Sequence, residues 1–208
     1  MRDRNDSLAL TTAIGGLVAL AIAMGIGRFA FTPILPMMQA DGVLSLREGG
    51  WLASANYLGY LVGALLAGRR GGGPRALLRN GLVLVVVTTA SMGALASLPW
   101  WLVARFVAGV ASAWVLVGTA ALSLARLNEI GRPRLSGLVF AGVGAGTALA
   151  GLACQLIASL GGGATAAWWA LAIVAGAGIA FVWRGVGAAA AVDDVVAAVG
   201  TPAASDPG

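Results

Sequence analysis

The feature that most constrains this chain is a series of long apolar runs separated by short polar segments. A helix needs about 20 apolar residues to cross the hydrocarbon core of a bilayer. We therefore predict an all-α integral membrane protein with six transmembrane helices. The predicted spans are residues 8–38, 50–68, 76–98, 100–125, 135–160 and 164–183.

The composition agrees with this class, because 59% of the 208 residues are hydrophobic and only 10% are charged. Little of the chain is left for a soluble domain. We expect a short N-terminus at residues 1–7, a transmembrane domain at 8–184, and a flexible tail at 185–208 that is rich in alanine, glycine and proline. The first apolar run exceeds the roughly 7 to 15 residues of a signal-peptide core, which favours a retained helix.

The positions of the arginines predict the orientation of the helices. The chain has neither lysine nor histidine, and its arginines gather before span one, after spans two and four, and after span six. The positive-inside rule then places both termini in the cytoplasm. A bias toward alanine, glycine and arginine is typical of a GC-rich bacterial genome, so we expect the bacterial inner membrane. Nucleic-acid binding is disfavoured, since the arginines lie singly or in small groups between apolar runs.

The acidic residues argue against an enzyme. All of them lie in tails or connections: Asp3, Asp6, Asp41, Glu48, Glu129, Asp193, Asp194 and Asp206. A Ser-His dyad, a zinc site, an aspartyl dyad or a proton relay each needs histidine or carboxylates within the spans. We therefore expect no catalytic residue, no metal ligand and no cofactor. The single cysteine, Cys154, allows no internal disulfide.

Glycines at helical spacing indicate close packing between the helices. Small residues four positions apart let helix backbones approach in lipid, where no hydrophobic effect draws helices together. The predicted packing glycines are Gly59, Gly63, Gly109, Gly142, Gly146 and Gly151.

Two arginines, Arg28 and Arg105, lie deep within predicted spans, whereas Arg79 lies at the beginning of one. An arginine near the bilayer centre costs from about 2.5 to more than 10 kcal/mol, so it should face the bundle interior or water. Neither has a carboxylate of this chain at its depth. The remaining partners are backbone carbonyls, hydroxyls and water, an anionic ligand, or acids of another polypeptide, and Arg105 could also extend to the outer surface.

Polar residues at helical spacing around these arginines could line one internal cavity. The alternative is that the neutral ones form hydrogen bonds between helices without any ligand. The candidate cavity-lining residues are Arg28, Thr32, Asn56, Tyr60, Arg105 and Ser112.

Several motifs resemble one family. GIGRFAFTPILPMMQ (residues 25–39) and LREGGWLASANYLGYLVGALLAG (46–68) resemble the first two spans of the YbfB-like group of the major facilitator superfamily (MFS). RFVAG (105–109) is similar to the superfamily's fourth-span RxxxG element, and GVGAGTALAG (142–151) to its fifth-span glycine motif. Ala67 replaces the usual aspartate of the loop after span two, and Thr147 replaces a proline.

This resemblance implies the N-terminal half of a secondary transporter. Such a half consists of two inverted three-helix repeats and moves a small solute by alternating access. The two arginines favour an anionic solute. The expected partners are the lipid bilayer, the solute, and a second six-helix half or a copy of the chain itself. A truncated six-span remnant, or a membrane interaction protein without transport of its own, is the alternative.

Overall fold

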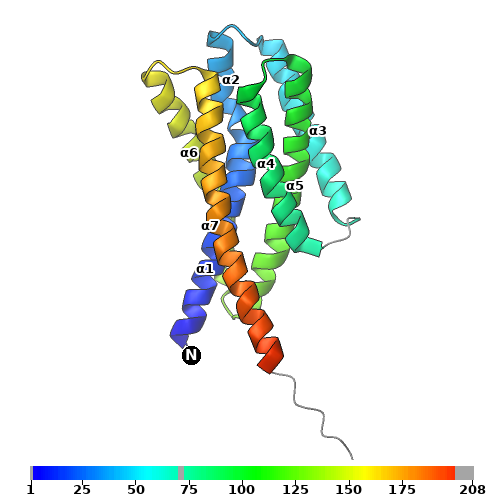
Figure 1. Cartoon of the computed structure of the whole chain (residues 1–208), viewed down its shortest axis with the longest axis vertical. Coiled ribbons are helices and arrows are strands. Elements are labelled where there is room, and N and C mark those ends of the chain that lie inside the picture. The colour runs from blue at the N-terminus through cyan, green and yellow to red at the C-terminus, as the bar shows by residue number, and fades with distance from the viewer. Residues whose placement is uncertain (1, 70–72, 200–208) are drawn as a thin grey trace, which may run out of the picture.

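The computed structural model describes the backbone of residues 2–69 and 73–199, with side chains at 5–69 and 73–184. Within these ranges the regular structure is entirely helical. The elements are α1 (Arg2–Leu20), the π-helix η1 (Ala21–Phe29), α2 (Phe31–Ala40), α3 (Leu46–Ala67), α4 (Gly73–Ala94), α5 (Leu98–Glu129), the short 3₁₀ helix η2 (Pro133–Leu135), α6 (Ser136–Ser159) and α7 (Ala164–Val199). They form an elongated bundle in which successive long helices run up and down (Figure 1).

Local sequence explains where the helices start and stop. Ser45 caps α3: its hydroxyl accepts from the Glu48 N–H, and the Glu48 carboxylate accepts in turn from the Ser45 N–H at 2.8 Å. This capping box holds the pKa of the Glu48 carboxyl below its ordinary value. Gly42 and Gly161, with φ of 72° and 78°, take the left-handed conformation that ends a helix and turns the chain.

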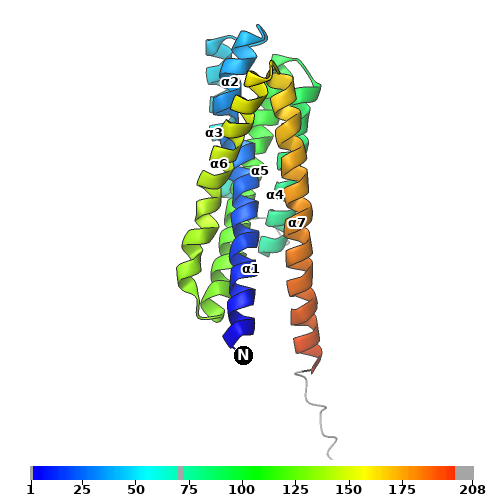
Figure 2. The same cartoon turned by 90° about the vertical axis from the view of Figure 1, so that its left-hand side faces the viewer.

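Helix α5 is the centre of one part of the bundle. It packs along α3 on one side and α4 on the other, and α4 in turn packs against α7. Helix α6 packs instead against α1 and η1, and Figure 2 shows α6 and α4 on opposite sides of α1. The main core therefore contains apolar side chains from both parts, including Ile26, Ile34, Leu82, Val115 and Trp168.

Glycines bring two helix pairs into backbone contact. A Cβ at Gly59 would overlap the Phe106 carbonyl of α5, and one at Gly109 would overlap the Asn56 carbonyl of α3. We call this the α3/α5 glycine contact, and it also includes Gly63.

The second pair joins α6 to the first span. A Cβ at Gly142 would overlap the Leu17 carbonyl, and Gly25 and Gly146 pack directly against the opposite backbone. We call this the α6/η1 glycine contact. Gly151 does not take part, contrary to the sequence prediction, because a Cβ there would meet no described heavy atom within 4 Å.

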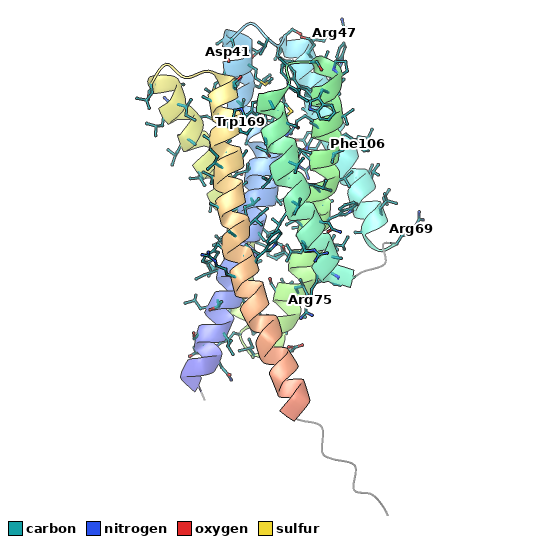
Figure 3. The ribbon with its side chains drawn as sticks, in the orientation of Figure 1. Asp41, Arg47, Arg69, Arg75, Phe106 and Trp169 are labelled. Atoms are coloured by element: carbon teal, nitrogen blue, oxygen red, sulfur yellow. The ribbon has the colours of Figure 1, made fainter. Side chains whose placement is uncertain are left out.

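At one end of the bundle, a hydrogen bond joins the end of the first predicted span to the beginning of the last one. The Asp41 carboxylate, just after α2, accepts from the Ala164 N–H of α7 at 2.7 Å. At the other end, Asp6 of α1 pairs with Arg132 in the connection before α6. Figure 3 places Asp41 and Arg47 at one end of the bundle and Arg75 toward the other.

Five described helical stretches are long and apolar enough to cross a membrane: residues 5–40, Gly73–Ala94, Leu98–Glu129, Pro133–Ser159 and Ala164–Arg184. Helix α3, which corresponds to the predicted second span, is not among them. It is long enough at 22 residues, but Ser54, Asn56 and two tyrosines lower its hydropathy. Six crossings therefore stay a prediction.

The C-terminal end of α7 differs from the sequence prediction. Helix α7 continues to Val199, so residues 185–199 are helical in the structure, whereas the sequence predicts a flexible tail there. The reason is the alanine-rich composition of this segment, since alanine has the highest helix propensity. The remainder of the predicted tail, residues 200–208, lies outside the described residues.

Candidate functional site

The centre of the first span is a π-helix rather than an α-helix. Nine residues, Ala21 to Phe29, adopt this wider winding, in which each carbonyl bonds to the N–H five residues later. Pro33 lies five residues after Arg28 and has no N–H to donate. The Arg28 carbonyl therefore lacks a donor of this type from its own helix.

Arg105 supplies that donor from α5. Its Nη2 donates to the Arg28 carbonyl and its Nη1 to the Gly27 carbonyl, both at 3.0 Å. The side chain is 3% exposed, and the Phe31 ring lies 4.8 Å from the guanidinium carbon. The structure thus places Arg105 between two helices, with both terminal nitrogens bonded to backbone, and not at the outer surface.

Asn56 and Ser112 also form bonds between helices. Asn56, 2% exposed on α3, donates from Nδ2 to the Arg105 carbonyl at 2.9 Å. The Ser112 hydroxyl lies 2.8 Å from the carbonyls of Ala23 in η1 and Ala108 in its own helix, and can donate to one at a time. Three of the six candidate residues are therefore buried and bonded to backbone.

Arg28 has a different environment. Its guanidinium carbon lies 3.9 Å from the centroid of the Tyr60 ring, 4.9 Å from Tyr57 and 5.5 Å from Phe29. Its Nε is buried and, like the Nε of Arg105, has no hydrogen-bond partner among the described residues. Aromatic rings cover the faces of a guanidinium but leave its N–H groups, which lie in the plane, free to bind an anion.

The remaining candidates flank this arginine. Tyr60 is partly buried under the guanidinium, and Thr32, one helical turn beyond Arg28, is exposed. The structure brings Arg28 and Tyr60 together, and it links them through the Arg28 carbonyl to Arg105.

Sequence reasoning missed two contacts of Arg28. Tyr57 and Phe29 were not among the candidate residues, although both rings lie near its guanidinium. The spacing of Tyr57 and Tyr60, three residues apart on α3, was a usable signal because such residues share a helix face.

Two cavities lie elsewhere on the bundle. One of about 430 Å³ is formed by α4, α5 and α7, and another of about 640 Å³ lies between α1 and the connection from α5 to α6. Neither is lined by any of the six candidate residues. No group of three or more metal-ligating side chains occurs in the part of the chain that the structure describes.

The apolar helices define the class: this is a multi-pass membrane protein built of helices. It belongs to the family described as uncharacterised MFS-type transporter YbfB, whose pattern matches residues 20–203. The match covers most of the chain and confirms the resemblance seen in the sequence motifs. A search of the curated proteins finds no match. The chain is therefore an MFS-type membrane transport protein, of a superfamily that normally carries solutes and does not catalyse reactions.

Proposed function

We propose that this chain takes part in secondary active transport of a small anionic solute by alternating access, and that Arg28 binds the solute. The proposal rests on the surroundings of the Arg28 guanidinium group. Its guanidinium is stacked on tyrosine rings, its buried Nε has no partner in the described chain, and every acid of the sequence lies outside the predicted spans.

The chemistry favours a carboxylate-bearing solute. An arginine can form two parallel hydrogen bonds with a carboxylate, and such charged bonds are about twice as strong as neutral ones. Because Arg105 already donates to two carbonyls, Arg28 is the arginine left for the solute. The positive charge of Arg105 nearby adds to the attraction for an anion.

The proposal is tested with the full chain reconstituted in liposomes. We expect uptake of small radiolabelled mono- or dicarboxylates and none of the matching amides. Arg28→Gln should lower carboxylate uptake at least about tenfold, the range for losing a hydrogen bond to a charged group, and Arg28→Lys should retain part of it. Arg47→Gln is the matched control, because Arg47 also stacks on an aromatic ring, that of Trp51.

A binding measurement separates solute recognition from transport. In detergent, millimolar carboxylate should raise the Tm of the wild type and of Arg47→Gln but not that of Arg28→Gln. An anion site at Arg28 would be contradicted if amides were taken up, or raised the Tm, as much as carboxylates do. It would also be contradicted if Arg28→Gln left carboxylate uptake and the rise in Tm unchanged.

We also propose that the chain crosses the bacterial inner membrane six times with both termini in the cytoplasm. The grouping of arginines supports this orientation. A periplasm-active reporter fused at Gly42 should be active, and one fused at Gly131 inactive. The reverse pattern would overturn the orientation, and activity at both sites would contradict the number of crossings.

A second six-helix unit is proposed as the partner that completes the solute path. Large apolar side chains are exposed along α3 and α6, among them Leu58, Leu61, Leu152 and Leu156. The unit is either a separate half or a copy of this chain. Crosslinking in native membranes that yielded only monomers would count against both forms of the partner.

A further inference from the structure

A groove on the α4 side of the bundle has two chemically different parts. It is the cavity of about 430 Å³ lined by Arg79, Asn80, Val83, Leu84, Trp114 and Trp183. It shares no residue with the candidate solute site. Helices α4 and α7, which contribute most of its lining, lie side by side along one face of the bundle (Figure 1).

The polar part of the groove lies at the arginine-rich end of α4. Arg79 and Asn80 are exposed and one helical turn nearer to the start of α4 than Val83 and Leu84. Among the described residues Arg79 has no ion-pair partner. Arg75, one turn earlier still, lies toward the end of the bundle opposite Asp41 (Figure 3).

The rest of the groove is apolar and aromatic. Val83 is 39% and Trp183 46% exposed, whereas Trp114 of α5 is 6% exposed and closes the floor. Trp183 lies beside Arg184, the first charged residue along α7. Tryptophan at such a place is typical of the level of lipid headgroups.

We propose that this groove binds one anionic phospholipid. The phosphate is held by Arg79 and Asn80, and an acyl chain lies along Val83, Leu84 and the two tryptophan rings. Basic pockets between transmembrane helices suit anionic headgroups. A soluble anion would use only the polar part, whereas the apolar part opens between helices that face hydrocarbon. The site is independent of the solute proposed for Arg28.

Native mass spectrometry of the purified full chain tests this site. The probes are dioleoyl phosphatidylglycerol and dioleoyl phosphatidylcholine, added separately to the detergent-solubilised protein. We expect one phosphatidylglycerol to bind more tightly than phosphatidylcholine. Arg79→Gln should weaken phosphatidylglycerol binding about fivefold, the effect of one arginine at a membrane surface, and Arg79→Lys should restore it.

Arg75→Gln is the matched control, because this arginine lies on the same helix but does not line the groove. It should leave phosphatidylglycerol binding unchanged, and circular dichroism should give the same helix content for all variants. Excess inorganic phosphate should not displace the lipid.

Three results would each overturn the proposal. The first is equal binding of the two lipids, and the second is an equal loss in Arg75→Gln and Arg79→Gln. The third is displacement by inorganic phosphate, which would show that the polar part alone makes the site and that an acyl chain does not belong in the groove.

Discussion

Arg105 shows at the scale of a residue how an arginine is held inside an apolar bundle without a carboxylate. Its two terminal nitrogens donate to carbonyls of another helix, at the place where Pro33 withholds an N–H. The carbonyls of η1 therefore stabilise the charge of Arg105, and Arg105 in turn supplies hydrogen-bond donors to η1. The Nε of both arginines has no partner among the described residues, but only Arg28 has terminal nitrogens that no described carbonyl occupies.

Replacing Arg105 should cost more than replacing any neutral residue that bonds between these helices. Arg105→Met removes two charged hydrogen bonds and leaves the Arg28 carbonyl without a donor, so we expect a loss of about 3 kcal/mol or more in the free energy of unfolding. Asn56→Ala, which removes one neutral bond to the Arg105 carbonyl, should cost about 0.6 kcal/mol. Unfolding by SDS in mixed micelles measures both.

A comparable cost for the two variants would mean that water replaces Arg105 at the Gly27 and Arg28 carbonyls. Arg105→Lys should give an intermediate value, since an ammonium group cannot bridge the two carbonyls with the planar geometry of a guanidinium.

The sequence singles out Arg28 and Arg105 but does not distinguish their partners. From the sequence, backbone carbonyls and anions are both possible partners of these two arginines, because sequence spacing does not show which helices lie face to face. The four interhelical bonds of Asn56, Arg105 and Ser112 join residues 49 to 89 positions apart. Only the packing of α3, α5 and η1 distinguishes a bonded side chain from one that is free.

At the scale of an element, α6 has two kinds of glycine. Gly142 and Gly146 belong to the α6/η1 glycine contact, whereas Gly144 and Gly151 have no described heavy atom within 4 Å of a Cβ position. The same spacing motif therefore contains packing glycines and glycines without neighbours. The helix face, and not the number of glycines, decides which ones matter.

Alanine substitutions on α6 should separate these two kinds. Gly146→Ala forces the α6 and η1 backbones apart, and overpacking of this kind costs about 1 to 3 kcal/mol. Gly151→Ala should be neutral or stabilise by up to about 1 kcal/mol, because alanine favours a helix over glycine. SDS unfolding of both variants gives the comparison, and a Gly146→Ala variant as stable as the wild type would disprove the close approach.

The positions of most helices follow from the lengths of the apolar runs, but the π-helix η1 and the C-terminal extension of α7 do not follow from them. The π-helix depends on donors from α5 and on Pro33 together, so no local pattern predicts it. The extension of α7 was missed because the alanines before Asp193 were interpreted as a linker, although the same composition favours a helix.

At the scale of the whole molecule, polar contacts near both ends tie distant parts of the chain together. Asp41 joins the end of α2 to the start of α7, and Asp6 joins α1 to the connection before α6. The first contact is also favourable because a carboxylate lies at a helix N-terminus, where the helix dipole is positive.

Loss of the Asp41 contact should be measurable at α7. Asp41→Ala removes the acceptor of the Ala164 N–H, and we expect a loss of about 1 kcal/mol with faster hydrogen exchange in the first turn of α7. Asp41→Asn should retain most of this stability. Asp6→Asn is the comparison, with a loss below about 1 kcal/mol for an exposed ion pair. If hydrogen exchange in the first turn of α7 were unchanged in Asp41→Ala, Asp41 would not cap this helix.

The two glycine contacts have a consequence for how a gene of this kind can change. Every missense mutation of a glycine codon adds a Cβ, so at Gly59, Gly109, Gly142 and Gly146 each one puts an atom into the opposing backbone. Relief would need a compensating shift of a whole helix, which no second point mutation provides. These codons should therefore vary only silently, while those of Gly144 and Gly151 are free to drift to alanine or serine.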